Sequence, residues 1–138
     1  MFSQAEYSND IISTFINVSA SNSAYKRIDY FRKKDLVLRK ELIKLDAKKF
    51  VFTNGSHDHV KNITKHLGID DLFTGTFDIT DCNLIPKPSL EPYEKLVKKF
   101  GIIPEETIFI EDIAKNLEPA KKLGMKTAWL INLSLIHI

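Results

Sequence analysis

The sequence has little cysteine and no long apolar run: Cys82 is the single cysteine among 138 residues. One cysteine excludes an intrachain disulfide and any zinc site built from cysteines, and it fits a reducing compartment. No apolar run approaches the roughly 18 residues that a membrane-spanning helix needs. Residues 1–10 also lack the basic and then apolar order of a signal peptide. We therefore expect a cytoplasmic protein with no membrane partner.

An excess of one charge is also missing, since the formal net charge is +2 at pH 7. So small an imbalance argues against a nucleic-acid partner. The composition is ordinary for a soluble globular protein, and the chain is long enough to bury one core.

Beyond residue 48, short apolar runs typical of buried strands alternate with segments of helical periodicity. The predicted strands are 49–53, 72–79, 107–110 and 127–131. The predicted helices are 33–44, a segment that Ser56 begins and Gly68 ends, a segment that Ser89 begins and Gly101 ends, and 117–123, closed by Gly124. This alternation predicts an α/β fold with a Rossmann-like parallel sheet flanked by helices. Nearer the start, the apolar spacing over 11–18 predicts one further helix.

Three polar clusters follow or adjoin apolar runs: Thr53-Asn54-Gly55, Lys87 between two prolines, and Glu111-Asp112. Ligands of parallel sheets bind at the carboxyl ends of the strands, where the first and last clusters lie. A threonine hydroxyl and amides at a helix start can bind phosphate oxygens, and a lysine can neutralise them. Adjacent carboxylates favour Mg²⁺, which prefers a few carboxylates together with water and substrate oxygens.

Each cluster alone also fits an ordinary structural role. Thr53 could satisfy backbone groups at the strand end, and Lys87 could be a solvated loop lysine. The Glu111-Asp112 pair could be a solvent-facing acidic turn or a helix cap. The order and spacing of the three clusters are more specific than any one of them.

As a set, Phe52-Thr53-Asn54, Lys87-Pro88 and Ile110-Glu111-Asp112 resemble the second, third and fourth motifs of the haloacid dehalogenase superfamily of phosphohydrolases. Longer strings are similar to its pyrimidine 5′-nucleotidase subgroup. They are Tyr25-Lys26-Arg27-Ile28-Asp29-Tyr30, Phe52-Thr53-Asn54-Gly55, His66-Leu67-Gly68-Ile69, Glu111-Asp112-Ile113-Ala114-Lys115-Asn116-Leu117 and Ala120-Lys121-Lys122-Leu123-Gly124-Met125-Lys126-Thr127.

The resemblance implies a Mg²⁺-dependent phosphatase whose substrate is a small phosphate ester, with a pyrimidine nucleoside 5′-monophosphate expected. Thr53, Asn54 and Gly55 would bind the phosphoryl group, and Lys87 would neutralise it together with the nucleophile. Asp112 would ligate Mg²⁺ with Glu111 assisting. Asn116 would support the metal loop from behind.

The family's first motif, Asp-x-Asp-x-Thr, which supplies the nucleophile, has no counterpart in this sequence. The nearest string, Asp10-Ile11-Ile12-Ser13-Thr14, has isoleucine at its third position. We therefore expect a truncated and inactive chain that lacks the first strand, so that the sheet position between the strands of Thr53 and Glu111 is empty. Residues 1–32 would be the remnant of a helical cap and linker, and 33–132 a partial core. Non-catalytic phosphate binding and carbon–halogen hydrolysis remain as alternatives.

The last six residues, 133–138, read as a translation of the transposon mosaic end used in sequencing-library preparation. We expect this tail to lie outside the biological sequence, and we exclude it from the fold prediction.

Overall fold

The computed structural model describes residues 11–13 and 36–131 of the chain. The strands in these ranges are β1 (Ile11–Ser13), β2 (Phe50–Phe52), β3 (Gly75–Phe77), β4 (Thr107–Glu111) and β5 (Lys126–Trp129). The α-helices are α2 (Leu36–Lys44), α3 (His57–Leu67), α4 (Leu90–Phe100) and α5 (Leu117–Lys122). The 3₁₀ helices are η3 (Asp70–Leu72), η4 (Pro104–Glu106) and η5 (Ala114–Asn116). The predicted α/β alternation is confirmed.

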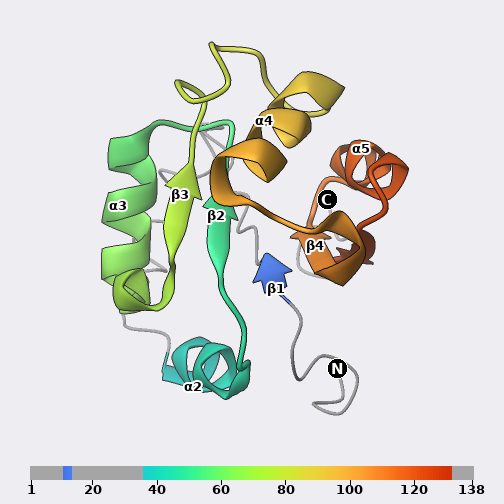
Figure 1. Ribbon diagram of the computed structural model, residues 1–138. Coiled ribbons are helices and arrows are strands. Elements are labelled where there is room, and N and C mark those ends of the chain that lie inside the picture. Colours follow the sequence, from blue (N-terminus) through green and yellow to red (C-terminus); the bar gives the residue numbers. More distant parts are fainter. Residues whose placement is uncertain (1–10, 14–35, 132–138) are drawn as a thin grey trace.

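All strand pairs in the described residues are parallel, and they form two ladders (Figure 1). One ladder has the order β1-β4-β5 and the other joins β2 to β3. β1 lies between β2 and β4 (Figure 1). The carboxyl ends of β2 and β4 therefore face the same edge of the fold, where the sequence places Thr53 and Glu111.

β1 corrects two expectations about the N-terminal part. Residues 11–13 form a strand rather than the predicted helix, and they occupy the position beside β4 that we expected to be empty. Two adjacent β-branched isoleucines favour the extended backbone, and pairing with β4 satisfies their peptide groups. The sequence of this strand is Ile-Ile-Ser, so it brings no carboxylate to the centre of the sheet. The rest of the expected cap remnant and the tail 133–138 lie outside the described residues.

Helix boundaries follow the predicted capping residues at most ends. Ser56 caps α3 by accepting a hydrogen bond from the amide of His59, and Gly68 ends that helix in the left-handed conformation. Gly101 ends α4 in the same way. Ser89 precedes α4, but its side chain makes no capping hydrogen bond. The segment predicted as strand 72–79 is shorter than expected, because β3 pairs residue for residue with the three residues of β2.

An aromatic core lies between the strands and α4. Phe50 and Phe52 share one face of β2, as the two-residue period of a strand requires, and both pack in this core. Tyr93 of α4 is fully buried against Phe52, with ring centroids 5.1 Å apart, and Phe109 of β4 lies 5.5 Å from Tyr93. This packing fixes the ends of β2 and β4 relative to α4. No helix in the described ranges is long and apolar enough to cross a membrane.

Candidate phosphate and metal site

Thr53 lies directly after β2 and is fully buried. Its amide donates to the carbonyl of Phe77 at 3.0 Å, and its Oγ1 accepts a hydrogen bond from the amide of Gly55 at 2.9 Å. The hydroxyl therefore holds the tight turn between β2 and α3, which is the local role that the sequence left open. The same turn directs the start of α3 to the carboxyl edge of the strands.

The side chain of Asn54 forms two hydrogen bonds with the backbone of Lys87. The amide of Lys87 donates to Oδ1 of Asn54 at 2.8 Å, and Nδ2 of Asn54 donates to the carbonyl of Lys87 at 3.3 Å. One side chain thus satisfies both backbone groups of a residue 33 positions away. In the ligand-free chain, Asn54 fixes the backbone from which the lysine side chain extends. The Lys87–Pro88 peptide that follows is cis.

The side chain of Lys87 is fully buried, so the alternative of a solvated loop lysine is wrong. Its Nζ donates to the carbonyl of Phe52 at 3.1 Å and to Oε2 of Glu111 at 2.7 Å. It also lies 4.7 Å from the centroid of the Phe52 ring, within the range of a cation–π interaction. The ammonium therefore lies where β2 and β4 end, next to Thr53.

The carboxylate of Glu111 accepts hydrogen bonds from several parts of the site. This carboxylate is fully buried and accepts four hydrogen bonds. Oε1 accepts from the amides of Asp112 and Ile113 at 3.0 and 3.1 Å, while Oε2 accepts from Lys87 and from Nδ2 of Asn116 at 3.1 Å. These bonds fill the lone-pair positions of a carboxylate. Glu111 is therefore an internal counter-ion, and the alternative of a solvent-facing acidic turn is wrong for this residue.

The electrostatics of this pair follow from its burial. Desolvation lowers the pKa of Lys87 below its ordinary value, although the charge of Glu111 opposes this shift. Burial alone would raise the pKa of Glu111, but hydrogen bonding and the charge of Lys87 outweigh it and hold this pKa below its ordinary value. The charge of Glu111 favours the protonated form of Lys87, so the pair places an ammonium beside a carboxylate at this edge of the fold.

Asn116 is buried and joins Glu111 to α4. Its backbone carbonyl accepts a hydrogen bond from the hydroxyl of Tyr93 at 2.6 Å, while its side chain donates to Glu111. The sequence predicts a position for Asn116 behind the metal loop, but the motifs do not include Tyr93. A signal was present, because a buried tyrosine hydroxyl requires a partner and Tyr93 lies on the inward face of its helix.

Asp112 is exposed at the carboxyl end of β4, in contrast to Glu111. Its backbone carbonyl accepts a hydrogen bond from the indole Nε1 of Trp129 at 3.0 Å, which ties the loop to the end of β5. Within residues 11–13 and 36–131, no three histidine, cysteine or acidic side chains form a metal-binding group. As one oxygen donor at this edge, Asp112 fits the ligand chemistry of Mg²⁺, which keeps several waters and takes substrate oxygens.

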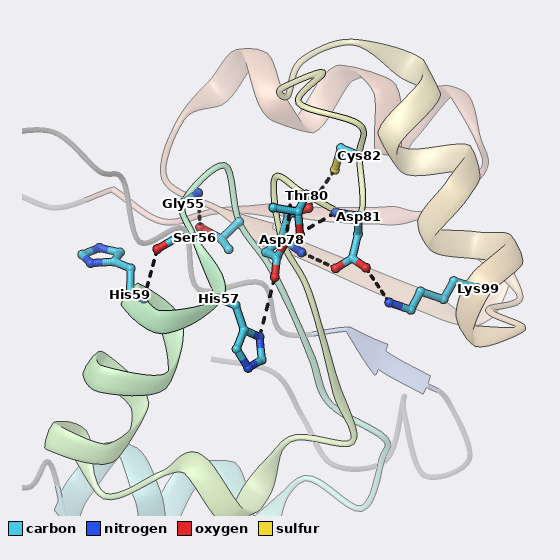
Figure 2. Close-up of polar contacts among 10 residues, drawn as sticks. Gly55, Ser56, His57, His59, Asp78, Thr80, Asp81, Cys82 and Lys99 are labelled. Atoms are coloured by element: carbon cyan, nitrogen blue, oxygen red, sulfur yellow. Dashed lines mark hydrogen bonds and ion pairs between the residues drawn. The ribbon is translucent and has the colours of Figure 1, made fainter.

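A further buried carboxylate, which the sequence motifs did not indicate, lies just after β3. Asp78 is buried, and its Oδ1 accepts hydrogen bonds from the amide and the hydroxyl of Thr80 at 2.8 and 2.5 Å (Figure 2). Its Oδ2 lies 3.6 Å from Nδ1 of His57, and its carbonyl accepts from the thiol of Cys82 at 3.2 Å. Burial would raise the pKa of Asp78, but the hydrogen bonds from Thr80 and from the amide of Asp81, together with the charge of His57, outweigh it and lower the pKa.

These contacts stabilise the loop that leads from β3 to Lys87. Its second acidic residue, Asp81, accepts from the amide of Asp78 at 2.9 Å and pairs with Lys99 of α4 at 2.6 Å (Figure 2). The amide of Ile79 donates to the carbonyl of Gly55 at 3.2 Å, which joins this loop to the turn after β2. The position of Lys87 is thus fixed by the hydrogen bonds of the loop that precedes it and by its own backbone hydrogen bonds to Asn54.

The chain is similar to known hydrolases in sequence and in fold. A family model described as haloacid dehalogenase-like hydrolase matches residues 1–130. The enolase-phosphatase E1 of Zygosaccharomyces rouxii is 30% identical over 101 residues, covering 72% of this chain and 44% of that protein. The glyceraldehyde 3-phosphate phosphatase of Pyrococcus furiosus is 30% identical over 95 residues, covering 66% and 39%. The chain thus spans less than half the length of these curated relatives.

Solved structures show the same fold. The L-2-haloacid dehalogenase of Xanthobacter autotrophicus superposes with a TM-score of 0.65 at 20% identity, covering 87% of this chain and 51% of that one. A family enzyme from Bacteroides thetaiotaomicron, solved in complex with magnesium and inorganic phosphate, has a TM-score of 0.58 at 24% identity, covering 75% and 56%. With a family model matching nearly the whole length, the chain belongs to the haloacid dehalogenase-like hydrolases.

Proposed function

We propose that this chain forms the phosphate-binding and metal-loop part of a Mg²⁺-dependent phosphomonoester hydrolase. The observation that carries the proposal is the buried ammonium of Lys87, held between the carbonyl of Phe52 and the carboxylate of Glu111 where β2 and β4 end. A buried lysine fixed by two acceptors beside a helix start is a preorganised cation for a phosphoryl group.

Each residue then has a defined role. Lys87 neutralises charge on the phosphoryl oxygens, and the hydroxyl of Thr53 with the amide of Asn54 binds them at the positive end of α3. Gly55 contributes by orienting that hydroxyl, since its amide donates to Oγ1 of Thr53. Glu111 and Asn54 hold the ammonium and the backbone of Lys87 in place. The exposed carboxylate of Asp112 would ligate Mg²⁺, which would supply further charge neutralisation at the phosphate.

The nucleophile motif has no counterpart in this sequence, so we propose that this chain alone does not turn over substrate. Reading the DNA upstream of the Met1 codon tests this part. An in-frame extension that encodes an apolar strand and Asp-x-Asp-x-Thr would support the hydrolase. An in-frame stop would favour the second candidate, a non-catalytic phosphate-binding module, which rests on the same missing motif.

The substrate we propose is a pyrimidine nucleoside 5′-monophosphate, on the sequence strings that are similar to the 5′-nucleotidase subgroup. Two of the relatives bear other phosphatase names, an enolase-phosphatase and a glyceraldehyde 3-phosphate phosphatase. Phosphate release from a pyrimidine nucleoside 5′-monophosphate and from glyceraldehyde 3-phosphate, measured with the hydrolase that contains this chain, compares these two substrates directly. Halide release from a 2-haloacid would instead support the dehalogenase alternative, for which Mg²⁺ is not needed.

The role of Asp112 can be tested on this chain without turnover. Because the side chain is exposed, Asp112→Asn should change the free energy of unfolding by less than about 0.5 kcal/mol. It should abolish the Mg²⁺-dependent increase in affinity for inorganic phosphate, measured by calorimetric titration. Asp46→Asn is the matched control, since Asp46 lies away from the site, just after α2. Equal phosphate affinity of the two variants at every Mg²⁺ concentration would show that Asp112 does not ligate the metal.

A further inference from the structure

We infer that Tyr93 is a positioning residue for Lys87, acting through a buried relay of hydrogen bonds. The tyrosine hydroxyl donates to the carbonyl of Asn116 at 2.6 Å, Nδ2 of Asn116 donates to Oε2 of Glu111 at 3.1 Å, and the same oxygen accepts from Lys87 at 2.7 Å. The inference rests on the proposed function only in naming Lys87 as the cation that binds phosphate.

Burial makes the relay specific. Tyr93, Asn116, Glu111 and Lys87 are all at most 4% exposed. No member of the relay can exchange a lost partner for bulk water, so the removal of one hydroxyl leaves a buried carbonyl without its donor. The carbonyl concerned belongs to the residue whose side chain orients Glu111. A displacement of Asn116 is therefore transmitted to the carboxylate and from it to the ammonium.

Tyr93 is also connected to the ammonium of Lys87 through the ring of Phe52. The Tyr93 ring packs edge-on against Phe52, with centroids 5.1 Å apart, and the ammonium of Lys87 lies 4.7 Å from the centroid of Phe52. Tyr93→Phe keeps this ring packing and deletes only the hydroxyl. The substitution therefore isolates the hydrogen-bond relay from the aromatic core.

Burial also raises the pKa of Tyr93 well above its ordinary value, with the charge of Glu111 adding to the effect. The hydroxyl is therefore protonated at neutral pH and acts as a hydrogen-bond donor. Its role is to hold geometry rather than to transfer a proton.

A matched control is available on β4 itself. Thr107 is fully buried at the start of that strand, and its hydroxyl donates to the carbonyl of Ile103 at 2.7 Å. Thr107→Val therefore removes a buried hydroxyl-to-carbonyl bond of the same kind at the opposite end of β4 from Glu111. A purely structural role for Tyr93 predicts that both substitutions have the same effects.

The experiment records the ¹H–¹⁵N signal of the Lys87 ammonium in the ligand-free chain, assigned by its loss in the double variant Lys87→Met, Glu111→Gln. We expect a resolved signal in the unsubstituted chain, a shifted or exchange-broadened signal in Tyr93→Phe, and an unchanged signal in Thr107→Val. Inorganic phosphate should bind about 3- to 10-fold more weakly to Tyr93→Phe than to Thr107→Val, the effect of one hydrogen bond.

The inference is overturned if the Lys87 signal of Tyr93→Phe matches that of Thr107→Val, or if the unsubstituted chain shows no protected ammonium. Because the signal is recorded without phosphate, its outcome is independent of the proposed function. A shift in Tyr93→Phe alone, with no phosphate binding by any variant, would leave the relay intact and contradict the phosphate site.

Discussion

The ammonium of Lys87 lies 2.7 Å from Oε2 of Glu111, and both side chains are fully buried. The two residues are 24 positions apart and come from a loop and from the end of β4. Together with the hydrogen bond from Lys87 to the carbonyl of Phe52, this pair joins the three segments that resemble the second, third and fourth motifs of the family. The stability of the fold and the charge of the proposed phosphate site therefore depend on the same contact.

Lys87→Ala should destabilise the fold by about 3–5 kcal/mol, because it leaves Glu111 ionised and buried without its counter-ion. The double variant Lys87→Met, Glu111→Gln removes both charges and should cost far less. Urea unfolding of the two variants measures the difference. An equal loss of unfolding free energy in the two variants would contradict this prediction. It would show that the cost comes from losing the ion pair and not from leaving Glu111 unpaired.

Acid should weaken the fold through Glu111. Its pKa lies below the ordinary value of 4.5 in the folded chain, so the unfolded chain binds a proton first as the pH falls. The stabilising contribution is complete above the unfolded pKa and is lost as the pH falls through the folded pKa. Asp71 and Asp78 have lowered pKa values and act in the same direction.

The double variant tests the share of Glu111 in this acid response. Its free energy of unfolding, followed from neutral pH into the acid range below the ordinary pKa of a glutamate, should fall less steeply than that of the unsubstituted chain. Parallel pH profiles would assign the acid response to the aspartates alone.

Lys49 should be a structural rather than a functional lysine. Its buried Nζ donates to the carbonyls of Leu45 and Ala47, just after α2, at 2.7 and 3.0 Å. Lys49→Met leaves these carbonyls without that donor and should cost about 1–3 kcal/mol of stability. Lys48→Met, at the neighbouring position, is the control and should have little effect. Phosphate affinity should be the same in both variants.

Trp129 should report on the loop of Asp112. It is the single tryptophan of the chain, and its indole donates to the carbonyl of Asp112. Addition of Mg²⁺ together with inorganic phosphate should therefore change its fluorescence. The change should be absent in Asp112→Asn and present in Asp46→Asn. A response that survives in Asp112→Asn would place the metal elsewhere.

The sequence was sufficient to locate the strands and helices of the core because burial and capping are local patterns. The apolar run before Thr53 and the glycines Gly68 and Gly101 mark β2, α3 and α4 at nearly the observed boundaries. β1 was not predictable, because its three residues pair with a strand that is distant in the sequence and the helical spacing around them is stronger than any strand signal.

For the site, the sequence predicted which residues meet but not how they are connected. Glu111 and Asp112 are adjacent and both acidic, yet one is fully buried and the other exposed. Only the tertiary partners of Glu111, which are Lys87 and Asn116, separate the two roles. Asp78 was missed for the same reason, since its neighbours Thr80 and His57 give no distinctive pattern in the sequence.

The most direct test of the account is the binding of inorganic phosphate to this chain, measured by calorimetric titration in the presence of Mg²⁺. We predict saturable binding to a single site in the unsubstituted chain and none in the folded double variant Lys87→Met, Glu111→Gln, which lacks the buried ammonium. Unfolding curves establish that the variant is folded. Equal phosphate affinity in the two proteins would contradict the assignment of Lys87 as the phosphate-binding cation.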